Sequence, residues 1–193
     1  MKSKKTVLIL VAVLAVLLVA AGILYRKFAA SAQPAPQTQT DTQTGGQADG
    51  GTQTIAAPDF SMQDADGNAV SFADITASGK PVILNFWTSW CGYCKQEMPD
   101  FEAAYKKYGD RIEFVMLNAA TNEYTQGDGA AYVESKGYTF PVYYDTDGAG
   151  VSTYGLNGFP ATVVVGTDGN IVYARTGMLT ADNLQTLIDS VLK

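Results

Sequence analysis

Residues 81–99 of this 193-residue chain read PVILNFWTSWCGYCKQEMP, and this stretch predicts the centre of the fold. The run 82–87 is apolar and partly β-branched, and it lies between Pro81 and the polar Thr88. A short apolar run with such boundaries is typical of a strand that is buried on both faces. We therefore expect a central strand over residues 82–87, with Trp87 packed in the core.

From Cys91 onward, apolar side chains recur at spacings of three and four residues: Cys94, Met98, Phe101, Tyr105 and Tyr108. This is the period of one face of an amphipathic helix, and Gly109 is a typical residue at which a helix ends. Cys91 is therefore expected where the strand passes into a helix N-terminus, with Cys94 one turn inside the helix.

That position predicts chemistry for the two cysteines. Backbone N–H groups without partners and the helix dipole favour negative charge at a helix N-terminus, so the Cys91 thiol is expected to ionise more readily than a free cysteine. Cys91 is the candidate nucleophile. Cys94 is the candidate resolving thiol, which attacks a mixed disulfide formed at Cys91 and releases the client. The chain contains no histidine, so no imidazole activates either thiol.

The charge of the chain is unevenly distributed. Five of its 13 basic residues lie within the first 27 residues, whereas all 19 acidic residues follow residue 40. The chain after residue 27 therefore carries eight basic and 19 acidic residues, which is a net charge of −11. Nucleic acid is disfavoured as a partner, because a phosphate backbone requires a basic face.

Residues 7–24 form an uncharged apolar run that is long enough to cross a bilayer. We expect a transmembrane anchor over residues 7–25 and a cytoplasmic N-terminus over residues 1–6, whose positive charge slightly outweighs that of Arg26 and Lys27. A secretory signal peptide is the alternative, because the small residues at 30–32 resemble a cleavage site. The length of the apolar run and the intervening Arg26 and Lys27 favour an uncleaved anchor.

Residues 26–55 are rich in Gln, Thr, Gly and Pro without an apolar period, which predicts a disordered linker before a folded domain over residues 56–193. The domain is expected to begin with a β-hairpin around the turn at 66–68. Further strands are expected over 112–117, 140–144, 162–166 and 171–174, and further helices over 126–136, 148–154 and from Thr180 onward. This order predicts an α/β fold with a mixed sheet covered on both faces.

Several segments and the order of the elements carry a resemblance to a known family, and the segments are Asn85-Phe86-Trp87, Trp90-Cys91-x-x-Cys94, Pro99 and Gly158-Phe159-Pro160-Ala161-Thr162. They resemble the thioredoxin fold, and more narrowly the membrane-anchored TlpA/ResA-like thiol-disulfide oxidoreductases of the thioredoxin superfamily. It implies a thioredoxin-like mixed β-sheet flanked by helices, with an N-terminal β-hairpin and a central helical insertion at residues 121–137.

The resemblance also implies roles for residues near the cysteines. Phe159-Pro160 matches the position of a cis X-Pro bond, beside which the backbone pairs with the extended chain of the client. Glu97 matches a glutamate that helps to move the proton of the second cysteine, and the alternative is an exposed helix glutamate without a role. Asn85 stands where ordinary thioredoxins have a buried aspartate.

The remaining residues around the cysteines predict a client-contact surface and a redox poise. Trp90 and Tyr93 are candidates for an apolar rim that clients touch. Gly92 and Tyr93 lie between the cysteines, where residues tune the stability of the Cys91 thiolate. We expect a reducing to intermediate potential.

Other uses of the two cysteines have less support. A structural zinc site needs about four Cys or His ligands, and a c-type haem attachment requires His where Lys95 stands. A purely structural disulfide is an alternative, although it would close a very small loop that stabilises little. We expect no metal and no cofactor.

Two other functions remain as alternatives. Peroxiredoxin-like thiol peroxidases share the fold, and residues 57–60 and Thr88-x-x-Cys91 resemble their motifs, but Leu84 stands where they have proline. Arg111 and Arg175 are the candidates for the arginine that they require. A non-catalytic tethered binding module, which holds a basic partner on an acidic surface, is supported by net charge alone.

We therefore predict a single-pass protein of the cell membrane whose catalytic domain lies outside the cytoplasm and reduces disulfides in client proteins. The resemblance implies a membrane thiol electron donor of the CcdA/DsbD type. It implies, as clients, apocytochrome c in cytochrome c biogenesis, mispaired secreted proteins or a surface methionine sulfoxide reductase.

Overall fold

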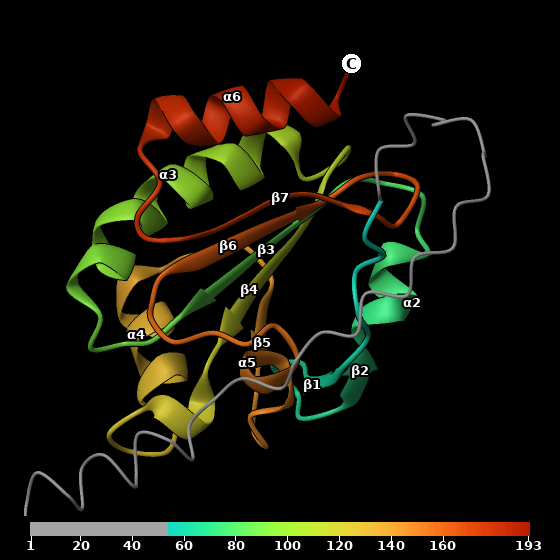
Figure 1. Cartoon of the computed structure of the whole chain (residues 1–193). Coiled ribbons are helices and arrows are strands. Elements are labelled where there is room, and N and C mark those ends of the chain that lie inside the picture. The colour runs from blue at the N-terminus through green and yellow to red at the C-terminus, as the bar shows by residue number, and fades with distance from the viewer. Residues whose placement is uncertain (1–53) are drawn as a thin grey trace, which may run out of the picture. The chain divides into compact units, whose positions relative to one another are not determined.

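The computed structural model describes residues 54–193, which form one mixed seven-stranded sheet with flanking helices (Figure 1). The strands are β1 (Ser61–Gln63), β2 (Ala69–Ser71), β3 (Val82–Trp87), β4 (Glu113–Asn118), β5 (Val142–Tyr144), β6 (Ala161–Val165) and β7 (Ile171–Thr176). The helices are α2 (Phe72–Thr76), α3 (Gly92–Tyr108), the 3-10 helix η1 (Ala120–Asn122), α4 (Asp128–Lys136), α5 (Ala149–Thr153) and α6 (Ala181–Val191).

The predicted anchor over residues 7–25 and almost all of the predicted linker lie outside the described residues. Within residues 54–193, no helix combines the length and the apolar character that crossing a membrane requires.

The strand β3 lies inside the sheet, whose order is β2-β1-β5-β4-β3-β6-β7. It pairs parallel to β4 and antiparallel to β6, and each of its residues is buried. Because successive side chains of a strand point to opposite faces, β3 supplies both halves of the core. Ile83 and Trp87 pack with α3 and α6 on one face, whereas Leu84 and Phe86 pack with Phe72 on the other. The predicted central strand and the predicted cover on both faces are confirmed.

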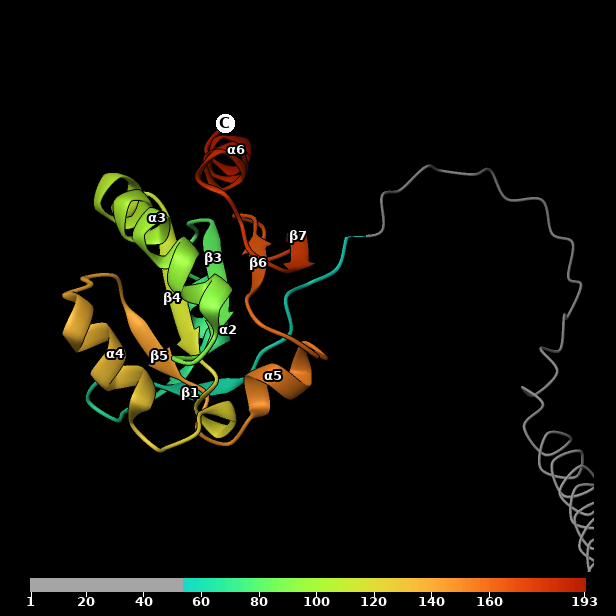
Figure 2. The same ribbon diagram turned by 90° about the vertical axis from the view of Figure 1, so that its left-hand side faces the viewer.

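The helices α3 and α6 lie alongside one another, as two views of the domain show (Figures 1 and 2). Thr180 caps the N-terminus of α6 by accepting a hydrogen bond from the backbone N–H of Asn183 at 3.3 Å. Leu184 and Ile188 of α6 are buried against this half of the core. The helix that the sequence predicts from Thr180 onward is therefore confirmed.

The hairpin β1–β2, the insertion that carries η1 and α4, and the final hairpin β6–β7 occur where the sequence predicts them. The helix α2 is an element that the sequence patterns did not indicate. Ser71 caps it by accepting from the backbone N–H of Ala73, and Phe72 is its buried residue. Five residues are too few to show an apolar period, so the periodicity of the sequence does not reveal this helix.

Candidate active site

The two cysteines lie where β3 gives way to α3. Cys91 is the N-cap of α3, and its Sγ accepts a hydrogen bond from the backbone N–H of Cys94 at 3.1 Å. A disulfide joins Cys91 to Cys94, and both residues are buried. The expected placement of Cys91 at a helix N-terminus is confirmed. A helix N-terminus stabilises a thiolate at Cys91. The first turn of α3 contains no acidic residue, so no carboxylate of that turn counteracts this stabilisation.

The segment that contains Pro160 lies beside this end of β3. Ala161 of β6 pairs with Phe86 of β3, which places Pro160 next to the end of the strand that leads to Cys91. The Phe159–Pro160 bond is cis, as the resemblance implied. The ring of Phe159 meets the ring of Trp90 edge-on, with 6.3 Å between the centroids. The structure therefore brings Trp90, Phe159 and Pro160 together at the cysteines.

Two exposed aromatic residues lie next to the cysteines in the chain, and a third contacts one of them. Trp90 is 42% exposed and Tyr93 is 64% exposed, as expected of a rim, whereas Trp87 is fully buried in the core. Gly92 is exposed between the cysteines, and a Cβ on it would meet no atom within 4 Å. Tyr124, which is 82% exposed, lies with its ring 5.6 Å from that of Trp90. Sequence reasoning missed Tyr124, because the residues around it form no recognisable motif.

Glu97 lies one turn beyond Cys94 in α3 and is 1% exposed, so the alternative of an exposed glutamate is wrong. One carboxylate oxygen accepts from Asn85 Nδ2 at 2.8 Å, and the other accepts from the backbone N–H of Leu179 at 2.8 Å. Burial raises the pKa of Glu97 to about 7, although the hydrogen bonds from Leu179 and Asn85 act to lower it and nearby Asp100 raises it. At neutral pH this carboxyl group therefore exchanges a proton readily.

Asn85 is the partner of Glu97 in the central strand. Its Nδ2 also donates to Thr162 Oγ1 at 3.1 Å, so the amide joins β3, α3 and β6. Its Oδ1 is buried and has no hydrogen-bond partner within residues 54–193. A buried carboxyl group, that of Glu97 in α3, therefore lies beside this position of β3. The sequence showed Asn85 and Glu97 separately, but nothing in it showed that they touch.

The alternatives find less support in the geometry. Within residues 54–193, no group of three or more metal-ligating side chains is assembled. The guanidinium of Arg111 lies 5.2 Å from the centre of the Tyr108 ring, which is at the opposite end of α3 from Cys91. Arg175 is exposed on β7. Arg111 is therefore not placed to act on Cys91 as the arginine of a peroxidase would.

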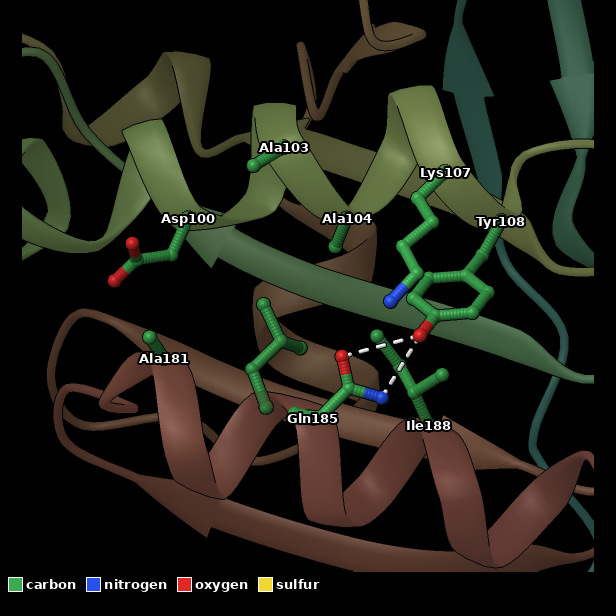
Figure 3. A pocket seen from close by; sticks show the side chains of 9 residues that line it. Asp100, Ala103, Ala104, Lys107, Tyr108, Ala181, Gln185 and Ile188 are labelled. Atoms are coloured by element: carbon green, nitrogen blue, oxygen red, sulfur yellow. Dashed lines mark hydrogen bonds between the residues drawn. The ribbon is translucent and has the colours of Figure 1, made fainter.

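A pocket of about 160 Å³ lies between α3 and α6, away from the first turn of α3 (Figure 3). Tyr108 Oη donates to Gln185 Oε1 at 3.1 Å, and Gln185 Nε2 lies 2.9 Å from the same hydroxyl oxygen. The residues that line the pocket are Asp100, Ala103, Ala104, Lys107, Tyr108, Ala181, Leu184, Gln185 and Ile188. All of these residues belong to α3 or α6, and none of them is a candidate site residue.

Comparisons with known proteins agree with this geometry. A family model described as the AhpC/TSA family matches residues 54–174. The chain is 33% identical to the thioredoxin-like protein YneN of Bacillus subtilis (strain 168) over 133 residues, which is 69% of this chain and 76% of YneN. It is 32% identical to the thiol-disulfide oxidoreductase ResA of the same organism over 125 residues, which is 64% of this chain and 67% of ResA.

A solved structure extends the similarity from sequence to fold. The crystal structure of StoA from Bacillus subtilis matches with a TM-score of 0.59 at 29% sequence identity. The match covers 68% of this chain and 96% of StoA. The similarity therefore covers nearly the whole of the StoA chain.

Proposed function

The chain belongs to the AhpC/TSA family and is a thiol-disulfide oxidoreductase with a thioredoxin-like fold, and from this premise we propose that it reduces disulfides of client proteins outside the cytoplasm while tethered to the membrane. One observation carries the proposal. The Cys91–Cys94 pair lies at the N-terminus of α3, with the carboxyl group of Glu97 buried one turn further along the same helix.

The first step is the attack of the reduced Cys91 thiolate on a client disulfide. A bond forms between Cys91 Sγ and one client sulfur, and the client S–S bond breaks. The second client sulfur leaves as a thiolate and takes a proton from solvent. Trp90, Tyr93 and Phe159 contact the client around this bond, and the backbone beside Pro160 pairs with its extended chain.

The second step is the attack of Cys94 on the mixed disulfide. Cys94 gives its proton to Glu97 and its sulfur bonds to Cys91 Sγ, which releases the first client sulfur. That sulfur takes up the proton, so the client gains two electrons and two protons while the enzyme becomes the disulfide. Two observations support Glu97 as the base: Cys94 is buried away from bulk water, and the pKa of Glu97 is raised to about 7.

The proposed location follows from the N-terminal sequence. The uncharged run over residues 7–24 is long enough to serve as an anchor in the bilayer, and the lysines before it favour a cytoplasmic N-terminus. A reductase outside the cytoplasm is oxidised in each turnover and needs an electron source. We assign that role to a membrane thiol donor of the CcdA/DsbD type. The proposed clients are apocytochrome c, mispaired secreted proteins or a methionine sulfoxide reductase.

Trapping tests the proposed function. In cells that produce the full chain with Cys94→Ala, mixed disulfides with client proteins should accumulate at Cys91, and dithiothreitol should reduce them. The double variant Cys91→Ser/Cys94→Ala is the matched control and should trap nothing. The purified wild type should reduce insulin, and Cys91→Ser should not. Rapid consumption of peroxide without trapped clients would favour the peroxidase, and function that survives Cys91→Ser would favour the binding module.

Fractionation tests the tether. The full chain should sediment with membranes and resist extraction by high salt, because an apolar anchor holds it rather than charge. Protease added outside intact protoplasts should remove the domain over residues 56–193. A released chain that has lost its first 32 residues would show a cleaved signal peptide instead.

A further inference from the structure

The carboxylate of Glu123 joins three parts of the active-site region. One of its oxygens accepts from the backbone N–H of Ser89 and from Asn118 Nδ2, each at 2.6 Å. The other oxygen accepts from the hydroxyl of Ser89 at 2.6 Å. Ser89 lies two residues before Cys91, and Asn118 is the buried last residue of β4. Glu123 therefore connects the loop before Cys91 to β4 of the sheet through hydrogen bonds.

The residues next to Glu123 hold the same loop through Trp90. The indole N–H of Trp90 donates to the backbone carbonyl of Asn122 at 2.8 Å, and the Tyr124 ring lies against the Trp90 ring. Three consecutive residues from the segment after β4 thus contact the loop at residues 88–90. None of them belongs to the WCxxC motif or to the segment at Pro160.

The hydrogen bonds that hold this loop also affect the distance between the two thiols. The backbone N–H of Cys91 donates to the carbonyl of Thr88 at 3.2 Å, so the position of Cys91 follows that of the loop. In the reduced protein no covalent bond holds the two sulfurs together. A fixed loop raises the effective concentration of one thiol at the other and so favours the disulfide. A dithiol that readily becomes a disulfide is a strong reductant.

We propose that Glu123 is a positioning residue for the redox site: it fixes the loop at residues 88–90 so that Cys91 stays within reach of Cys94 and the dithiol stays reducing. The inference rests on the proposed reductase function and assigns to Glu123 part of the control over its potential. Glu123 acts through Ser89 and Asn118 and does not touch the reacting sulfurs.

Two substitutions separate positioning from charge. In Glu123→Gln, the amide oxygen still accepts from Ser89 N–H and Asn118, and the amide nitrogen donates to the hydroxyl of Ser89. Three hydrogen bonds therefore remain, with the direction of the one to the Ser89 hydroxyl reversed, while the negative charge is lost. Glu123→Ala loses all three. Positioning predicts that Gln substitutes for Glu and that Ala does not.

Glu102 offers a matched control on α3. Its carboxylate also bridges to a distant segment, accepting from Thr139 N–H at 2.9 Å, Thr139 Oγ1 at 2.7 Å and Phe140 N–H at 3.2 Å. It lies 11 residues beyond Cys91, which is about 16 Å along a helix. Glu102→Ala should lower thermal stability as Glu123→Ala does, without changing the redox equilibrium.

The test is the equilibrium of the purified full chain with glutathione buffers, together with the rate of insulin reduction. Glu123→Ala should shift the exchange constant about tenfold toward the dithiol, which makes the potential about 30 mV less negative. Its insulin reduction should slow by about tenfold. Glu123→Gln and Glu102→Ala should stay within about twofold of wild type in both measurements.

Other results would overturn the proposal. If the exchange constant and insulin reduction of Glu123→Ala match those of wild type, the carboxylate does not act by positioning. The same conclusion follows if Glu123→Gln changes both measurements as much as Glu123→Ala does. If Glu123→Ala does not fold, Ser89→Ala decides: it removes one of the three hydrogen bonds, and an exchange constant unchanged from wild type would refute the proposal. A wild type that neither exchanges with glutathione nor reduces insulin would refute the proposed function itself.

Discussion

The helix α3 carries two buried glutamates whose pKa values move in opposite directions. Burial raises the pKa of Glu97 to about 7, and its two hydrogen bonds do not overcome that effect. Burial is the largest single influence on the pKa of Glu102 as well, and it acts to raise that pKa. Hydrogen bonds from Lys106, Thr139 and Phe140 together outweigh burial and lower the pKa of Glu102 below the usual 4.5. Glu102 has a cation 2.9 Å away, whereas uncharged groups hydrogen-bond to Glu97.

The difference separates a structural carboxylate from one suited to proton transfer. Glu102 has enough donors to stay ionised, and it ties α3 to the segment before β5. Glu97 has too few hydrogen-bond donors to keep it fully ionised, so its charged and neutral forms are close in free energy at neutral pH. Such a group one helical turn from a thiol that must lose a proton is expected at a functional site. The comparison therefore predicts opposite behaviour when pH or sequence is changed.

The largest expected effect is the pH dependence of stability due to Glu97. Its carboxyl releases a proton near pH 4.5 when unfolded and near pH 7 when folded. Between these values the unfolded state binds fewer protons, so the free energy of unfolding should fall by roughly 3 kcal/mol as pH rises. Urea denaturation from pH 4 to 8 should show this fall in the wild type and not in Glu97→Gln. Parallel curves for the two proteins would contradict the raised pKa.

The next effect is the loss of Glu102. Glu102→Ala leaves the backbone N–H groups of Thr139 and Phe140 without their acceptor, which should cost about 2 kcal/mol. Because the pKa of Glu102 is lowered, its stabilisation is present above pH 4.5 and is lost as pH falls, the opposite sign to Glu97. Denaturation at pH 7 measures the loss, and the exchange constant with glutathione is the control. A changed exchange constant would place Glu102 in the redox site.

Much of this arrangement was predictable from local patterns in the sequence. The run 82–87 and the spacing of Cys94, Met98 and Phe101 predict β3 and α3, because each pattern reports burial within a single element. The position of Cys91 follows from the junction between the two. Thr180 likewise signals α6 by its capping chemistry.

What the sequence did not show depends on contacts between elements. The partners of Glu97 are 12 residues before it and 82 residues after it, and Ser89 is 34 residues from Glu123. No periodicity links positions so far apart. A glutamate at position 97 therefore looked the same whether it was exposed or buried. Only the pairing of β3 with β6 and the path of the chain into α6 decide which it is.

A smaller effect is expected on catalysis. Glu97→Gln keeps the shape of the neutral carboxyl but cannot accept the proton of Cys94, so release of the client from the mixed disulfide should slow about tenfold at pH 8, or about 1.4 kcal/mol in activation free energy. Solvent would take the proton more slowly. Stopped-flow single turnovers measure this step. Alkylation of Cys91 by iodoacetamide is the control and should be unchanged, and equal client release would argue against Glu97 as the base.

The smallest effect tests which donors keep Glu102 ionised. Lys106 Nζ is 2.9 Å from Glu102 Oε1 in the favourable i,i+4 order, but the lysine side chain is 63% exposed. Water and salt weaken such a pair, so Lys106→Ala should cost only about 0.5 kcal/mol, and less in high salt. A double-mutant cycle with Glu102→Ala measures the coupling. The three hydrogen bonds from Thr139 and Phe140 remain in Lys106→Ala, so NMR titration should still find Glu102 ionised at neutral pH. If the pKa of Glu102 instead rose toward that of Glu97, the Lys106 ammonium alone would account for the difference in pKa between Glu102 and Glu97. The number of backbone donors would then not account for that difference.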